Sequence, residues 1–159
     1  TLGYSIQTGE QATKGFEAEV AASLSSRWNV SAAYSYIPSA KTTQSLVQSD
    51  IGQRINHVPK HAGGLFTRYY FNSERSGWNM GAGIRVQGAR TAQRGAYFVD
   101  LPKYTLVDAN IGYEEKSWGV SLSVKNVFNK DYIQGTTPNA QLINFGTPRT
   151  LILNARAKF

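Results

Sequence analysis

The last eleven residues of the chain alternate between apolar and polar side chains. Counting back from Phe159 to Leu151, every second residue is apolar, and the residues between them include Lys158, Arg156 and Asn154. A period of two is that of a β-strand with one apolar and one polar face. A terminal aromatic residue and cations on the polar face are typical of a transmembrane β-barrel, whose strands face lipid on one side and a polar lumen on the other.

The same alternation recurs through the rest of the chain. Seven further segments show it: 2–6, 16–24, 28–36, 65–71, 78–86, 107–113 and 118–124. The sequence therefore predicts an all-β fold, a transmembrane antiparallel β-barrel with about eight strands in this chain. The mean hydropathy of −0.36 agrees with this prediction, because every second residue of a barrel strand is polar.

The predicted connections alternate between short and long. Short turns are expected at 25–27, 72–77 and 114–117, and long loops at 42–60, 90–103 and 127–148, with a shorter loop at 9–11 on the long side. Outer-membrane barrels have this asymmetry, with short turns in the periplasm and long loops outside the cell.

Aromatic residues provide a second indication of a membrane, because Trp and Tyr favour its interfaces. Those expected in a girdle beside the short turns include Trp28, Trp78, Tyr113, Trp118 and Phe159. A second girdle near the loops is expected from Tyr36, Tyr104 and Phe128. The alternative is the core of a soluble β-sandwich, but such a core would place its large rings in mid-strand.

Charged residues at the polar positions are expected to face the barrel lumen. The cations among them are Arg68, Arg85, Lys125, Arg156 and Lys158. The acids are Glu17, Glu19 and Asp108, and for Glu17 and Glu19 we expect a cationic neighbour across the strand. A small barrel must pack such groups into ion pairs, whereas a wide barrel holds them against water or a plug, and the residues alone favour neither.

The sequence offers little that suits catalysis or metal binding. The two histidines, His57 and His61, are separated by Pro59, which breaks any helix that would bring them to one face. There is no cysteine and no Ser, His and acid set, so we expect neither an enzyme nor a metal site. The net charge of +7 is spread along the chain rather than clustered, which argues against nucleic-acid binding.

One predicted loop combines cations with aromatic residues. Arg90, Arg94, Tyr97 and Phe98 suit an anionic aromatic ligand, through charge and cation–π contacts. The alternative for this loop is a solvated segment with an interface belt. The loop that follows Gln141 is the second candidate for ligand contacts.

Four runs of the chain carry a family resemblance. Two of them precede the terminal phenylalanine: 124–132, with the sequence VKNVFNKDY, and 146–151, with the sequence GTPRTL. The other two, 9–19 and 58–65, lie earlier in the chain. Together they resemble the C-terminal end of TonB-dependent outer-membrane receptors, and most of all the siderophore branch.

The resemblance implies a bacterial outer-membrane barrel of about 22 strands. Residues 1–159 would be a single barrel segment without the plug and the N-terminal strands. It also implies uptake of ferric siderophores, with no resident cofactor. The expected partners are outer-membrane lipid, the siderophore, TonB through the missing plug region, and the barrel-assembly machinery through the C-terminal strand, with no nucleic acid. The alternative is a complete eight-stranded barrel with a structural or adhesive role.

Overall fold

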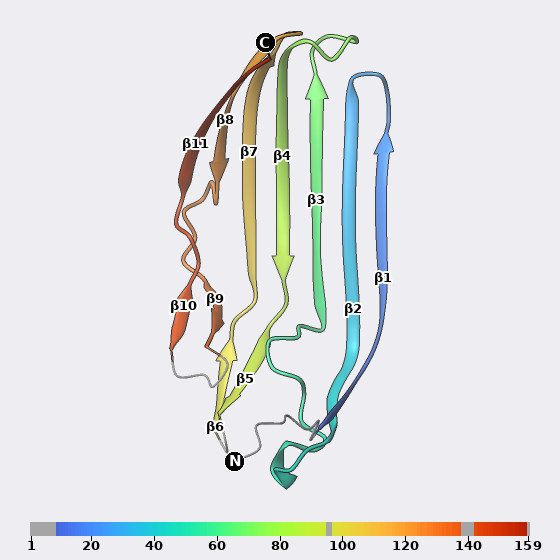
Figure 1. Ribbon diagram of the computed structural model, residues 1–159, viewed down its shortest axis with the longest axis vertical. Helices are drawn as coiled ribbons and strands as arrows, with labels where there is room; N and C mark the ends of the chain where they lie inside the picture. Colours follow the sequence, from blue (N-terminus) through green and yellow to red (C-terminus); the bar gives the residue numbers. More distant parts are fainter. Residues whose placement is uncertain (1–8, 95–96, 138–141, 159) are drawn as a thin grey trace, which may run out of the picture.

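The computed structural model describes residues 9–94, 97–137 and 142–158, which form antiparallel sheet structure almost throughout (Figure 1). The strands are β1 (Glu10–Ser23), β2 (Trp28–Gln44), β3 (His61–Tyr70), β4 (Gly77–Gln87), β5 (Arg90–Arg94), β6 (Tyr97–Leu101), β7 (Tyr104–Glu114), β8 (Trp118–Lys125), β9 (Ile133–Thr136), β10 (Ile143–Phe145) and β11 (Thr150–Ala157). A short 3-10 helix, η1 (Gln48–Asp50), follows β2. Among these residues no helix has the length and hydropathy needed to cross a membrane.

Seven long strands form one sheet in the order β1-β2-β3-β4-β7-β8-β11, and all neighbours are antiparallel. Seven of the eight predicted segments are therefore confirmed as strands, and the eighth, 2–6, lies outside the described residues. Within the described part of the chain β1 and β11 are the two edges of the sheet and do not pair with each other.

The register of the sheet separates apolar from polar side chains across all seven strands. Ala32, Leu65, Ile84 and Val107 lie opposite one another in one row. The next row, one residue along, brings Arg85 between Gly64 and Leu106 and belongs to the other face. We call these the apolar face and the polar face.

The apolar face has no covering layer. Leu65 is 46% exposed, Ile84 37% and Leu153 72%, whereas the buried apolar residues in the described ranges are only Ala40, Ala92, Leu101 and Leu106. A soluble β-sandwich would bury such a face under a second sheet. This single-layer sheet excludes the sandwich alternative, and its apolar face is suited to lipid.

The two ends of the sheet differ as predicted. The short turns that connect β1 to β2, β3 to β4 and β7 to β8 lie together at the upper end in Figure 1, and the longer connections lie at the lower end. We call these the turn end and the loop end.

Four predictions about the loop end need correction. The expected loops at 90–103 and 127–148 each contain a two-stranded ribbon, β5–β6 and β9–β10, since their backbones pair with themselves. β1 begins at Glu10, where a short loop was expected. β2 continues to Gln44, because its backbone stays paired with β1 as far as Glu10.

A buried asparagine joins two of the runs that resemble the receptor family. Asn126 is 3% exposed and has a left-handed φ of 51°. Its Nδ2 donates to the carbonyls of Lys130 (2.9 Å) and Thr147 (3.2 Å), and its backbone N–H donates to Asp108 Oδ1 (2.9 Å). Asn126 thereby fixes the end of β8 and the start of β11 against β7.

Tyr132 and Gly146 form the second contact between these runs. The Gly146 N–H donates to the Tyr132 carbonyl (2.8 Å), and a Cβ on Gly146 would lie 1.9 Å from Cζ of the Tyr132 ring. Only glycine allows the ring to lie so close to the backbone.

We expect Gly146→Ala to destabilise the barrel by about 1–3 kcal/mol, because the added methyl must displace the Tyr132 ring. The measurement is urea unfolding of the full-length receptor in lipid vesicles, followed by tryptophan fluorescence. Gly135→Ala is the matched control, because a Cβ at Gly135 meets no atom within 4 Å. Equal unfolding midpoints for the two variants would contradict the assignment.

Candidate functional site

Three chain segments meet at the loop end of the sheet. They are residues 45–60 with η1, the β5–β6 ribbon and the β9–β10 ribbon (Figure 1). The contacts between them determine which side chains remain free for a ligand.

Arg90 holds the two ribbons together. It is 8% exposed, and its guanidinium donates to the carbonyls of Gln134 (3.0 Å) and Ile133 (3.1 Å) on β9. Its Cζ also lies 5.7 Å from the centre of the Tyr104 ring. The expectation that Arg90 offers its charge to a ligand is corrected, because backbone carbonyls and an aromatic ring already surround that charge.

His57 connects the 45–60 segment to both ribbons. Its backbone has a left-handed φ of 65°, and its N–H donates to the Thr91 carbonyl (2.9 Å) on β5. Its Nε2 lies 2.8 Å from Thr136 Oγ1 on β9. The Thr136 hydroxyl donates its proton to the Thr137 carbonyl, so His57 Nε2–H is the donor.

Arg54 attaches the same segment to β2. Its Nη2 donates to the Ile37 carbonyl (2.7 Å), its Nη1 to Pro38 (3.1 Å) and its Nε to Val58 (3.0 Å). We call Arg54, His57 and Arg90 the rim clasp. Sequence analysis missed this clasp, because its partners are mostly backbone carbonyls and these leave no signature in the side chains.

The other predicted ligand residues have different positions. Tyr97 is 76% exposed and Phe98 54%, so both remain accessible on β6. Arg94 ends β5 opposite Tyr97, and its side chain is outside the described structure. Gln141 lies outside the described residues altogether, while Phe145, in the same predicted loop, is 74% exposed on β10.

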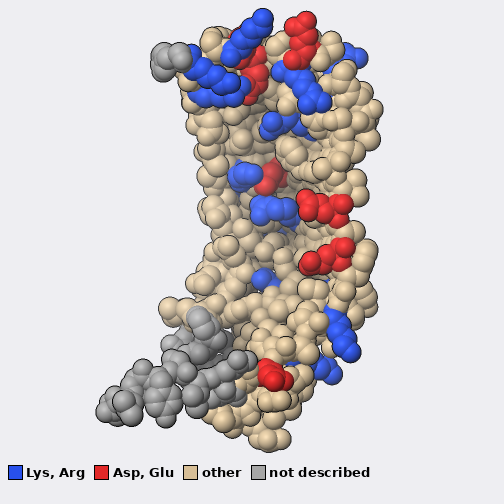
Figure 2. Space-filling view, turned by 45° about the vertical axis from the view of Figure 1, so that its right-hand side comes forward, with Lys and Arg blue, Asp and Glu red and all other residues tan. Residues whose placement is uncertain are grey.

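The polar face carries the charges that were expected to face a lumen, and Figure 2 shows basic and acidic side chains interspersed along the molecule. Asp108 on β7 accepts from Arg85 Nη2 (3.3 Å) and Lys125 Nζ (3.4 Å) on the strands on either side. Glu114 pairs with Arg156. Because these side chains are partly exposed, each pair contributes little to stability.

Arg68 and Lys158 complete the predicted set. The Arg68 guanidinium lies 5.7 Å from the centre of the Phe66 ring, and its Nε is buried without a partner in the described part of the chain. The Lys158 backbone N–H donates to the Ser117 carbonyl (2.7 Å), just beyond β11.

A hollow of about 660 Å³ lies on the polar face between the wall and the β9–β10 ribbon. Arg85, Asp108 and Lys125 line one part of it, and Tyr132 and Gln134 line another. Two cations beside one carboxylate leave a net positive charge, which suits an anionic group.

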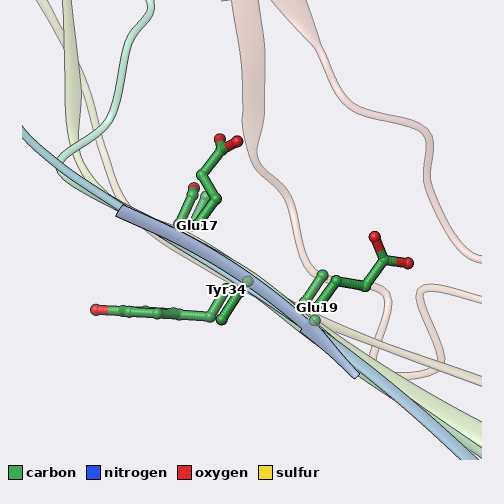
Figure 3. Close-up of a pocket in the computed structure, with 9 residues that line it drawn as sticks. Glu17, Glu19 and Tyr34 are labelled. Carbon is green, nitrogen blue, oxygen red and sulfur yellow. The ribbon is translucent and has the colours of Figure 1, made fainter. Parts of the chain in front are cut away.

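A second hollow, of about 470 Å³, lies beside β1 and β2. Figure 3 shows Glu17 and Glu19 projecting from one face of the sheet and Tyr34 from the other. The expectation of a cationic neighbour is wrong, because Ser35 lies opposite Glu17 and Ala33 opposite Glu19, and the described residues that line the hollow include no Lys or Arg.

Aromatic residues mark the turn end of the apolar face. The Trp78 and Trp118 rings pack on Tyr113, with ring centres 5.3 and 5.5 Å away, and Trp28 Nε1 donates to Thr67 Oγ1 (2.6 Å). Phe159, the remaining predicted girdle residue, is not among the described residues.

The loop-end girdle differs in part from the prediction. Tyr36 lies on the apolar face, where it stacks on His61 with ring centres 4.8 Å apart. Tyr104 pairs with Gln87 on the polar face and packs on Tyr132 (4.5 Å), so its assignment to the girdle is wrong.

These features define a class of protein: the fold is the wall of an outer-membrane β-barrel, apolar outside and charged on the opposite face. A profile of the family described as "TonB dependent receptor-like, beta-barrel" matches residues 1–127. The chain belongs to this family, which confirms the predicted family, the barrel fold and the bacterial outer-membrane location.

Similar proteins cover nearly the whole chain. A ferrichrome outer membrane transporter/phage receptor of Escherichia coli K12 is 30% identical over 98% of it, and a metal-pseudopaline receptor of Pseudomonas aeruginosa is 29% identical over 96%. The crystal structure of the ferric-catecholate import receptor Fiu from E. coli K12, in its closed form, superimposes with a TM-score of 0.79 at 25% identity, over 95% of the chain. The chain spans about a fifth of the length of each of these relatives, 21%.

We expect Arg90→Lys to loosen the β9–β10 ribbon, because a single ammonium cannot reproduce the two guanidinium donations. Amides of Ile133–Thr136 should exchange hydrogen at least about tenfold faster, which corresponds to about 1.4 kcal/mol. The measurement is hydrogen–deuterium exchange of the full-length receptor in detergent. Arg149→Lys is the control, since Arg149 is exposed at the start of β11. Unchanged exchange at β9 in Arg90→Lys would contradict the clasp.

Proposed function

We propose that the chain forms wall and rim of a receptor that takes up ferric siderophores across the bacterial outer membrane. The observation that carries the proposal is the single-layer sheet, with an uncovered apolar face on one side and charges on the other, in a chain of this receptor family. Relatives named as receptors for siderophores, ferrichrome among them, cover 95% or more of the chain and support it.

The proposed role is binding and passage, not catalysis. The wall contributes a hydrophobic exterior and a polar interior, and the rim contributes ligand contacts. We propose the siderophore and TonB as partners of the whole receptor, TonB through the plug region. Outer-membrane lipid and the barrel-assembly machinery are partners of the barrel itself, and nucleic acid has no place in this function.

The exposed aromatic residues of β6 are the best ligand candidates in the rim. Tyr97 and Phe98 begin β6, in the ribbon that Arg90 joins to β9 by two hydrogen bonds, and both rings are exposed. Arg94 and Gln141 stay proposals beside them. An aromatic surface suits the planar rings of many iron chelates, and a cation at the tip would complement their negative charge.

The alternative of a complete eight-stranded barrel is not favoured. In the described residues the seven-stranded sheet leaves its edge strands, β1 and β11, unpaired with each other, so it does not close. Lipid tolerates only closed barrels, because open edges expose unpaired backbone groups. The sheet therefore fits a wider barrel, in which further strands complete the wall.

We expect the double variant Tyr97→Ala, Phe98→Ala to bind its ferric siderophore about tenfold more weakly, since two contact rings are lost. Binding to the purified full-length receptor is measured by tryptophan quenching with ferrichrome, a ferric catecholate and a ferric pyoverdine. Phe128→Ala is the control, because Phe128 is 76% exposed but lies outside both ribbons. Failure of the unaltered receptor to bind any of the three chelates would overturn the proposed function. Normal binding by the double variant would overturn only the assignment of the rings.

A further inference from the structure

Two lysines lie on the apolar side of β1 and β2, near the loop end. Lys14 pairs with Ser39, and Lys41 pairs with Ala12, so the two lysines are diagonal neighbours on adjacent strands. Diagonal neighbours have Cβ atoms at most about 7–8 Å apart. Both side chains are exposed, and neither has an ion pair in the part of the chain that the structure describes.

A β-bulge gives Lys41 this orientation. Phe16 pairs with Tyr36 but Lys14 pairs with Ser39, so β2 uses one more residue than β1 across the interval. Without the extra residue, Lys41 would lie on the opposite face from Tyr36, since the two are five positions apart. The bulge returns Lys41 to the apolar side and turns Ala40 to the other side, where it is fully buried, at 0% exposure.

The height of the lysines corresponds to lipid head groups. From Trp28 to Tyr36 the strand covers about 27 Å along its own axis, which at the barrel tilt of about 35–45° is about 19–22 Å across the membrane, most of the apolar band of about 25 Å. Tyr36 stacks on His61, and the Tyr34 hydroxyl lies 2.7 Å from His61 Nδ1, as polar ring edges do at a membrane interface. Lys14 and Lys41 follow about 7–14 Å further along the strands, or about 5–11 Å further across the membrane, which places them at and just beyond the edge of the apolar band.

The two lysines make no ion pair with the charged groups around them. Glu10 lies two residues from Ala12, the partner of Lys41, but forms no ion pair in the described residues. The Arg54 guanidinium donates to the carbonyls of Ile37, Pro38 and Val58. Figure 2 shows basic side chains low on the side where β1 and β2 run toward the loops. A pair of ammonium groups that faces outward at head-group height is complementary to phosphate on a lipid.

We propose that Lys14 and Lys41 form a binding site for the phosphorylated head group of an outer-leaflet lipid. The ammonium groups extend from the edge of the apolar band to the phosphate, and their alkyl stems lie along the lipid-facing wall. The stacked rings of Tyr36 and His61 lie between the lysines and the apolar band, at the level where the acyl chains of the lipid begin. This site is independent of the siderophore and needs only the membrane location of the barrel.

The test uses the purified full-length receptor in nonionic detergent, titrated with bis-phosphorylated lipid A. Each lysine near an anionic lipid surface contributes about a fivefold gain in affinity, so Lys14→Gln with Lys41→Gln should weaken binding about 25-fold. Lys14→Arg with Lys41→Arg should keep it. Lys116→Gln with Lys158→Gln is the charge-matched control, because both lysines are exposed at the turn end, opposite the proposed site. Heat-modifiable migration on a gel verifies that each variant is folded.

Four results would overturn the proposal, the last being displacement of the lipid by inorganic phosphate. The first is equal affinity of the unaltered receptor and the double glutamine variant. The second is an equal loss in the double variant Lys116→Gln, Lys158→Gln, which would reflect net charge alone. The third is equal binding of lipid A from which the phosphates have been removed. Inorganic phosphate at the lipid's own concentration should leave binding unchanged, and displacement of the lipid by it would point to a site for free phosphate instead.

Discussion

The structure depends on one constraint, the hydrogen-bonded register of a sheet that is a single layer thick. Each strand residue belongs to one of two faces. No second layer of structure covers a side chain that lies on the wrong face. In a globular protein a misplaced polar group can find water or a partner in a loop. Here the rows through Leu65 and Arg85 are adjacent in the ladder but belong to different solvents. The alternation in the sequence is thus a direct record of two environments.

The rim follows a different rule from the wall. In the wall, backbone groups pair with neighbouring strands, and side chains follow the alternation of faces. At the loop end, the chain leaves the sheet and its carbonyls need other donors. Arg54 and Arg90 together donate to five backbone carbonyls, and His57 joins both ribbons to the preceding segment. Arg90, which the sequence offered as a cation for an anionic ligand, is therefore occupied in holding the rim together.

This difference explains how far the sequence alone could predict the molecule. The strands around Ala32, Ile84 and Leu153 were predictable, because their two faces lie in different environments. The alternation of apolar and polar residues along a strand follows from that difference. The motif around Asn126 was recognisable but its role was not, since it depends on backbone contacts with Thr147, far along the chain. Arg90 was predicted to contact a ligand, because the residue type alone does not show whether a guanidinium is buried or exposed. The outward direction of Lys41 could not be predicted, because a bulge adds one residue to β2 and so changes which residues beyond Tyr36 face outward.

The membrane stabilises the register of the strands, so residues on the polar face can be substituted without a change of register. A one-residue slip of β4 would move Arg85 into lipid, at a cost of about 2–4 kcal/mol for a cation near the midplane of the bilayer. It would also expose Ile84 and Val86 to the polar side. The ion pairs of Asp108 are therefore not needed to specify pairing, and partly exposed pairs add little stability. Because lipid fixes the strands from outside, substitutions on the polar face change the chemistry of the interior without changing the fold.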